Sequence, residues 1–239
     1  MIYVFLCESG DKMKLTNRLA SVASLIDECD TLVDIGTDHA YIPIFCVEND
    51  LCKKAIACDI NQGPLDIAEK NIKNYGLSEK ISTRLSNGFE NYVKSEAQCI
   101  VIAGMGGLLI NEIIKAGFEK ISDDTVLILQ PMIAIYEVRE FLLNNGFCIL
   151  DEKLAKEENK IYNIIKCKKG NDKYSEYEKY VGKKLIENKD PLLREHMNKK
   201  IYTINKVILG LKKTQNKDDE LKKNEMILSY YEKARKGQF

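Results

Sequence analysis

The chain has 239 residues, of which 45% are hydrophobic and 30% charged, and its 36 basic side chains balance its 36 acidic ones. This length holds one α/β domain with an appendage or two small domains, and the composition is that of a globular protein with a sizeable core. The apolar runs are too short to cross a membrane, so we predict no membrane partner.

The charge is divided unevenly along the chain. Residues 1–167 carry 17 basic and 25 acidic side chains, a formal charge of −8, whereas residues 168–239 carry 19 basic and 11 acidic ones, a formal charge of +8. A basic segment of this size on an acidic body predicts a polyanionic partner. The alternative is a solvated lysine-rich helical face.

The cysteines indicate a reducing compartment, and the positions of the histidines argue against a metal site. The eight cysteines form no CxxC pair and most lie in apolar runs, as free thiols of a reducing compartment do. We therefore predict a cytoplasmic protein. His39 and His196 lie far apart in the chain, so we predict no metal site.

Alternating and apolar runs predict five strands, at 31–35, 55–59, 81–86, 98–103 and 125–129. Helical patterns precede and follow them, at 14–29, from 41 onward, and at 63–75, 108–116 and 134–145. Residues 147–154 and 161–168 predict a closing hairpin with an acidic loop at 156–160. The sequence therefore predicts a mostly parallel, doubly wound seven-stranded sheet, the Rossmann-like layout of class I methyltransferases, whereas an NAD domain normally continues with parallel units.

The C-terminal pattern is helical. We predict one helix over 174–188, an N-cap and first helical residue at Asp190–Pro191, and a final helix from Glu220 after a polar break at 216–219. The middle helix, of about 22 residues by its apolar stripe, carries Leu193, Met197, Ile201, Ile204, Ile208 and Leu211. The predicted units are an extension at 1–12, a catalytic domain at 13–170 and a coiled-coil-like helical hairpin at 171–239.

The turn after the first strand predicts the ligand. Only Gly36 is present where a dinucleotide fold has G-x-G-x-x-G, and the nearby carboxylates of Asp34 and Asp38 would repel a pyrophosphate. They suit a ligand with an ammonium and a sulfonium, which favours S-adenosylmethionine. Thr37 completes this predicted cofactor turn.

Two further strand ends extend the predicted cofactor site. Asp59, with Ile60, follows the second strand about 20 residues later, where an acid accepts hydrogen bonds from a ribose. Asp59 alone does not discriminate NAD from S-adenosylmethionine. Asn87 and Gly88 end the third strand, where an adenine edge would lie.

The end of the fourth strand predicts close approach of a ligand and a base. It reads Ala103-Gly104-Met105-Gly106-Gly107, and glycines let the backbone come near a bound group. The alternative interpretation is a flexible turn between strand and helix.

Three strings together carry a family resemblance: D-I-G-T-D-H-A-Y at 34–41, A-G-M-G-G at 103–107 and L-Q-P at 129–131. With the C-terminal helical hairpin, the chain resembles the bacterial tRNA adenine-22 N1-methyltransferase family over residues 13–239. The resemblance implies a class I fold, S-adenosylmethionine as methyl donor and adenine 22 of the tRNA D-loop as target. Residues 1–12 depart from the pattern, which supports Met13 as the usual start.

N1 lies on the Watson–Crick edge, so the target adenine must be unpaired or flipped out. We predict that Tyr41 or Met105 stacks on it. Asp38 would stabilise the positive charge of the product or take a proton from N6, and His39 would orient Asp38 or cap the helix. Asp38, His39 and Tyr41 are the predicted catalytic residues.

The basic tail predicts an RNA-docking arm with phosphate contacts. Its candidates, with Arg18 from the first helix, are Lys183, Lys184, Lys199, Lys200, Lys206, Lys212 and Lys213. Arg139 is a second arginine for the substrate, although lone arginines more often form surface ion pairs. The apolar stripe is either the seam of an intramolecular hairpin or a dimer interface, and the hairpin, hence a monomer, is the simpler interpretation.

Two other function classes stay open. One is a methyltransferase for another RNA, a protein or a small molecule, with the arm used for dimerisation. The other is a non-catalytic RNA-binding module on the same fold. The basic arm argues against a small-molecule substrate, and the acids at successive strand ends argue against a fold that has lost catalysis.

Overall fold

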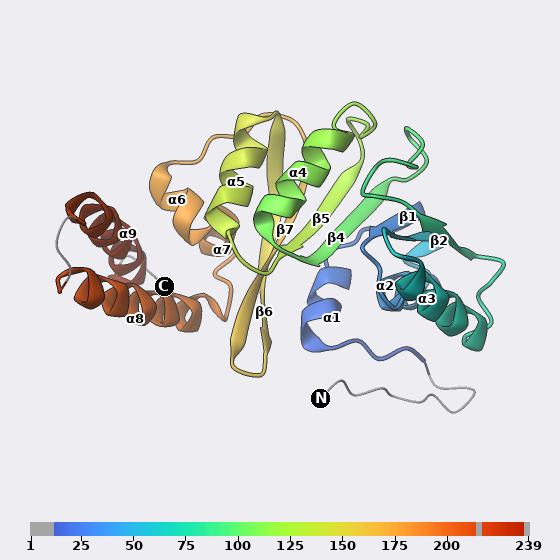
Figure 1. Ribbon diagram of the computed structural model, residues 1–239, viewed down its shortest axis with the longest axis horizontal. Helices are drawn as coiled ribbons and strands as arrows, with labels where there is room; N and C mark the ends of the chain where they lie inside the picture. Colours follow the sequence, from blue (N-terminus) through green and yellow to red (C-terminus); the bar gives the residue numbers. More distant parts are fainter. Residues whose placement is uncertain (1–11, 214–216, 237–239) are drawn as a thin grey trace.

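A computed structural model describes residues 12–213 and 217–236, so the predicted extension at 1–12 lies almost wholly outside the described part (Figure 1). A seven-stranded sheet has the order β3-β2-β1-β4-β5-β7-β6. The strands are β1 (Cys29–Ile35), β2 (Cys52–Asp59), β3 (Ile81–Leu85), β4 (Cys99–Met105), β5 (Val126–Pro131), β6 (Phe147–Glu157) and β7 (Lys160–Lys169). Only β7 runs antiparallel to its neighbours, β5 and β6. The predicted Rossmann-like sheet with a closing hairpin is confirmed.

The helices of the body alternate with the strands: α1 (Asn17–Ala23), α2 (Tyr41–Glu48), α3 (Gln62–Asn74), α4 (Gly107–Gly117) and α5 (Ile135–Asn144). Four more follow β7: α6 (Glu176–Val181), α7 (Lys183–Glu187), α8 (Leu193–Leu211) and α9 (Asp218–Lys236). The first helix is shorter than predicted at both ends: Thr16 caps its start by accepting the amide N–H of Leu19, and the helix ends at Ala23.

Side chains of the central strands point alternately to two separate cores. Leu32 of β1 packs with α1, α2 and α3, whereas Val33 packs with α4 and α5. Figure 1 shows these two sets of helices on opposite faces of the sheet. Strands buried on both faces explain the nearly continuous apolar runs in the sequence.

The order of the strands fixes where a ligand binds. The chain moves outward from β1 to β2 and β3, then returns to the other side of β1 with β4 and β5. In such sheets ligands bind beyond the carboxyl ends of the strands, at the point where the order reverses. That point lies between β1 and β4, where the Gly36 turn and the A-G-M-G-G segment meet.

Two predicted boundaries in the C-terminal half are wrong. The acidic loop at 156–160 is mostly strand, because β6 and β7 pair as far as Glu157 and Lys160. The single helix over 174–188 is broken at Gly182, which has a φ of +100°. A Cβ at Gly182 would lie 2.8 Å from Nη2 of Arg139, so packing against that guanidinium requires a glycine.

The start of α8 also differs from the prediction. Its N-cap is Leu192, and α8 spans 19 residues rather than about 22. The Asp190 carboxylate accepts the amide N–H of Leu192 at 2.8 Å and that of Leu154, on β6, at 2.9 Å. Asp190 therefore fastens the arm to the hairpin as well as capping a turn.

Helices α8 and α9 pack on each other and on α6 around a third apolar core. Near the far end of the pair Lys212 contacts Glu225, and at the near end the Tyr231 hydroxyl donates to the carbonyl of Tyr180. The two helices therefore run antiparallel, and the predicted apolar stripe packs within the chain. Figure 1 shows this arm at the opposite end of the molecule from α2 and α3.

Arg139 corrects a prediction: it is neither a surface residue nor a substrate contact. Its side chain is 1% exposed, and Nε donates to Glu152, which is equally buried, at 2.6 Å. Its other nitrogens donate to the carbonyls of Lys179 and Tyr180 and to Asn163 Oδ1. This buried group joins α5, the hairpin and α6, and so attaches the arm to the body.

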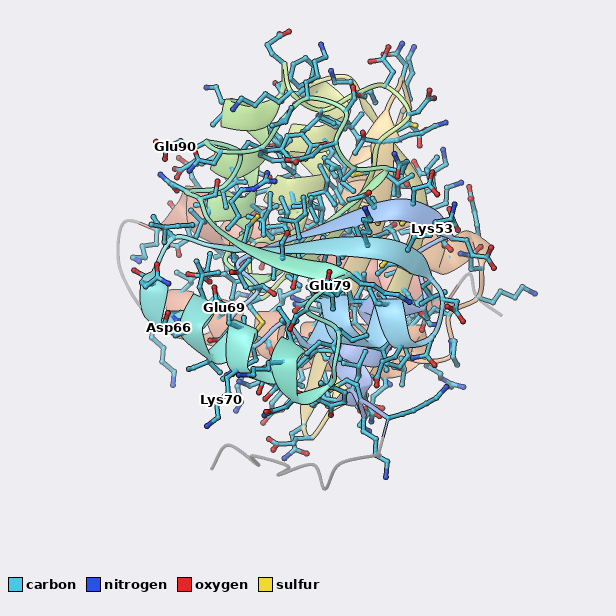
Figure 2. All side chains as sticks on the ribbon, turned by 90° about the vertical axis from the view of Figure 1, so that its right-hand side faces the viewer. Lys53, Asp66, Glu69, Lys70, Glu79 and Glu90 are labelled. Carbon is cyan, nitrogen blue, oxygen red and sulfur yellow. The ribbon has the colours of Figure 1, made fainter. Side chains whose placement is uncertain are left out.

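The other end of the body has a polar surface. Viewed from the β3 edge, Asp66, Glu69 and Lys70 project from the outer side of α3 (Figure 2). No helix in the described ranges is both long enough and apolar enough to span a bilayer.

Candidate active site

The turn after β1 is anchored to β2. Gly36 has a φ of +78°, and its amide N–H and that of Thr37 both donate to the carbonyl of Cys58 on β2, at 2.8 and 2.9 Å. A side chain at Gly36 would collide with the end of Met105 from β4. The turn is thus fixed to its neighbour strand, and its positive φ at Gly36 favours glycine.

Asp34 lies beneath this turn with its carboxyl group almost removed from water. Its Oδ2 accepts the hydroxyl of Thr37 at 2.7 Å. Burial raises the pKa of Asp34 to about 7, and the negative charge of Asp59 adds to this, whereas the Thr37 hydrogen bond opposes it. Because burial disfavours the ionised form of Asp34, a cationic ligand bound beside this carboxylate would be favoured.

Asp59 and the end of β3 border the same edge of the sheet. The Asp59 carboxylate accepts the amide N–H of Asn61 at 2.9 Å, and the neighbouring Ile60 side chain is 58% exposed. Asn87 is exposed and Gly88 has a φ of +55°. The acids at two successive strand ends are thus brought together, which suits a ribose and a cation and disfavours a pyrophosphate.

The A-G-M-G-G segment faces that turn from β4. Its register with β5 shifts between Ala103 and Met105, and Gly104 has a φ of +81°. Gly107 packs on the next loop, since a Cβ there would lie 2.6 Å from the carbonyl oxygen of Ala134. Both glycines are therefore required by geometry, and the segment is fixed in place rather than flexible.

The predicted catalytic residues form a compact turn between Gly36 and α2. Asp38 and Ala40 have φ values of +51° and +57°, a costly backbone conformation for residues with side chains. Nε2 of His39 lies 3.2 Å from Oδ2 of Asp38, and the imidazole stacks on the ring of Tyr41 with centroids 5.0 Å apart. Asn71 fixes the turn by donating to the carbonyl of His39.

Arg18 lies on the other side of the A-G-M-G-G segment. Its Nη1 donates to Oε1 of the fully buried Gln130 at 2.7 Å, and a Cβ at Gly104 would lie 3.8 Å from the same nitrogen. Glu157 accepts its backbone N–H, and its guanidinium lies 5.7 Å from the ring of Tyr162. Gln130 was not among the predicted site residues, although a polar residue ending an apolar strand was a signal for it.

The lysines of the arm fall into two groups. Lys183 and Lys184 contact Asp172 and Glu187, and both are only partly exposed. Burial, with Arg139 nearby, lowers the pKa of Lys200. Lys183 and Lys184 thus make contacts within the chain, and Lys200 is partly buried.

The other four lysines lie along α8 and just beyond its end. Lys199 contacts Glu195 and Lys212 contacts Glu225, both near the surface. Lys206 and Lys213 are exposed, and no carboxylate pairs with either one within residues 12–213 and 217–236. Nζ of Lys206 lies 4.5 Å from the ring centroid of the exposed Tyr202.

Comparison with known proteins identifies the family of this chain. Residues 15–165 match the model of the family described as "Methyltransferase domain". Over 160 residues, 67% of each chain, the sequence is 39% identical to the tRNA (adenine(22)-N(1))-methyltransferase of Bacillus subtilis strain 168. The chain belongs to this tRNA (adenine-22-N1)-methyltransferase family.

Solved structures of the family extend the similarity to the arm. The B. subtilis M1A22 tRNA methyltransferase TrmK has a TM-score of 0.86 at 30% identity, over 94% of this chain and all of that one. Streptococcus pneumoniae Sp1610, solved in complex with S-adenosyl-L-methionine, has a TM-score of 0.84 at 31% identity, over 93% of this chain and 100% of that one.

Proposed function

We propose that the protein transfers the methyl group of S-adenosylmethionine to N1 of adenine 22 in tRNA. One group of residues carries the proposal: the buried acids Asp34 and Asp59 and the glycine turns after β1 and β4. Arg18 of α1 borders this group through its hydrogen bond to Gln130, near the end of β5. Membership of the family supports adenine 22 as the target.

The site fits S-adenosylmethionine by its chemistry. Asp34, buried and without a cationic partner in the described residues, would balance the positive charge of the cofactor. Asp59 would accept the ribose hydroxyls, and the exposed Ile60 would cover the adenine ring. The bound cofactor supplies an electrophilic methyl group on a sulfonium.

The residues around the turn would act mainly by positioning. N1 of adenine has an in-plane lone pair, so no base has to remove a proton before N1 attacks. Gly104 and Gly106 allow the adenine to come within about 3 Å of the methyl carbon. Tyr41 would stack on the base, and Asp38, oriented by His39, would balance the positive charge that the ring gains.

The function predicts one product at one nucleotide. With an unmodified tRNA transcript and cofactor labelled in the methyl group, we expect label in N1-methyladenosine after nuclease digestion. A transcript with guanine at position 22 should stay unlabelled. Label at another nucleotide, in a protein or in a small molecule would replace the proposed substrate, and no transfer to any of them would favour a non-catalytic module.

We assign residues 13–170 to catalysis and 171–239 to tRNA docking. Lys206 lies four residues after Tyr202 and so shares one face of α8 with it, and Lys213 follows just beyond the end of the helix. Phosphates attract such cations without reading sequence, whereas an aromatic ring offers a surface for a base. The acidic body and the basic arm would orient the tRNA toward this end of the molecule.

The arm predicts a salt-dependent tRNA affinity. Replacing Lys206 and Lys213 by Gln should raise KM for tRNA and lower the slope of log affinity against log salt by about 0.7–0.9 for each phosphate that is no longer neutralised. Cofactor affinity, measured by calorimetry, should not change. Lys70→Gln, at the other end of the molecule (Figure 2), removes one such charge far from the arm and should alter neither quantity. An unchanged slope in the double variant would remove these two lysines from the docking surface.

The seven cysteines in the described residues are all free thiols; Cys7 lies outside that range. Burial raises the pKa of Cys52 and Cys58 to about 12, so both stay protonated and inert. Free buried thiols support our proposal of a cytoplasmic protein.

We also propose that the protein acts as a monomer, because the apolar stripe of α8 packs against its own chain.

A further inference from the structure

Four large apolar side chains stand exposed beside the A-G-M-G-G segment. They are Leu108 and Leu109 in the first turn of α4, and Met132 and Ile133 in the turn between β5 and α5. Leu108 is 61% exposed and Ile133 is 67% exposed. Apolar side chains gathered at the surface beside a site indicate that something else covers them.

The backbone holds these side chains outward. The amide N–H of Met132 donates to the carbonyl of Met105 at 2.8 Å, and that of Gly107 donates to the carbonyl of Ile133 at 3.1 Å. The next residue, Ala134, has a φ of +59°. The two turns are thereby fixed to each other, so the apolar edge is already formed and does not collapse into the core.

This edge adjoins the proposed methyl-transfer site. A Cβ at Gly106 would lie 4.0 Å from the Ile133 side chain, whereas a Cβ at Gly104 would lie 3.8 Å from Arg18. The same short segment therefore has a cation near one of its glycines and an apolar surface near another. An RNA strand offers both complements, a phosphate and the face of a base.

We propose that Leu108 and Ile133 form a platform for a nucleobase that neighbours the target adenine. The inference rests on the proposed function, because N1 is reached only when the target is unstacked and unpaired. Removing that base from the strand exposes the face of the base beside it. Leucine, isoleucine and methionine side chains cover or separate bases in this way in other nucleic-acid complexes.

The platform predicts a selective loss of tRNA methylation. Ile133→Ala and Leu108→Ala should each lower kcat/KM for tRNA about tenfold, as expected when an apolar side chain that covers a base is truncated. Cofactor affinity, measured by calorimetry, should stay within about twofold because neither side chain is part of the cofactor site. Ile67→Ala on α3, where the side chain is 43% exposed, is the matched control and should change nothing.

A fluorescent base tests the contact directly. An unmodified tRNA with 2-aminopurine beside the target adenine should change its fluorescence on binding wild-type protein, and much less on binding the Leu108→Ala/Ile133→Ala double variant. If wild type methylates tRNA while the variants keep full kcat/KM and the full fluorescence change, the platform is refuted and the proposed function stands. If the variants instead lose self-association in sedimentation with unchanged kcat/KM, a second copy covers the patch and the platform is also refuted. Absence of methylation by wild type refutes the proposed function itself.

Discussion

Replacing Asp34 by Asn is expected to weaken cofactor binding at least about 100-fold, because a charge-assisted interaction is removed, while making the free protein more stable at pH 8. The carboxyl group is buried, its pKa is raised to about 7, and Asp59 lies close enough to repel its charge. The amide keeps an oxygen for the Thr37 hydroxyl but carries no charge to set against a cationic ligand. Calorimetric titration with S-adenosylmethionine at pH 8 measures the loss.

The gain in stability has a definite pH dependence. In the unfolded chain the Asp34 pKa is about 3.9, so between that pH and about 7 only the folded protein keeps the proton. The free energy of unfolding of the wild type therefore falls as pH rises through this window, by up to about 1.4 kcal/mol per pKa unit. The asparagine amide does not titrate, so the Asp34→Asn variant should exceed the wild type in Tm at pH 8, and this advantage should shrink steadily as the pH falls toward about 4.

Two comparisons make the Asp34 result decisive. Asp38→Asn changes a carboxylate that is 66% exposed, and we expect it to lower turnover while cofactor affinity stays close to wild type. An Asp34→Asn variant that is less stable than wild type at pH 8 would show that the ionised carboxylate stabilises the fold. Unchanged cofactor affinity would remove Asp34 from the cofactor site.

Replacing Arg139 by Met is expected to lower the free energy of unfolding by about 3–5 kcal/mol. The variant leaves the 1% exposed Glu152 carboxylate without its cation, and it removes one donor from the carbonyls of Lys179 and Tyr180. Because these groups join the arm to the body, amide exchange should rise first in α6 and α7. Denaturant unfolding with hydrogen exchange measures both effects.

The double variant Arg139→Met/Glu152→Leu distinguishes the loss of the ion pair from the cost of leaving the Glu152 carboxylate buried without a cation. Removing both charges leaves an apolar contact, so much of the stability should return. Lys53→Met removes one partner of a surface pair, Lys53–Asp30, at the same 2.6 Å separation, and should leave the denaturant midpoint unchanged. If Arg139→Met also has no effect, the buried pair does not hold the arm in place.

Local patterns were enough to predict the sheet. The strands of the body are apolar or alternating runs, and most of its helices have one apolar face, so both kinds of element can be predicted from neighbouring residues. The acids and glycines at the strand ends were found in the same way. In a doubly wound sheet all parallel strands end at one edge, so residues far apart in the chain had to meet there.

Contacts between distant segments decided the rest. Arg139 and Gln130 look like ordinary helix and strand residues in the sequence, and only the fold shows that one holds α6 and the other holds Arg18. Gly182 sits within a helical pattern, and its role depends on a guanidinium 43 residues earlier in the chain. Whether a lysine of the arm contacts a carboxylate or faces solvent was equally unreadable from spacing alone.

The sequence by itself determined the fold, the kind of cofactor and the sign of the partner's charge, because periodicity, strand-end chemistry and charge distribution are local properties. The tertiary structure alone decided how the arm is attached and which surfaces border the reacting edge. The attachment of the arm and the surfaces beside the reacting edge depend on side chains whose partners lie in other elements. The spacing of residues in the sequence does not identify such partners.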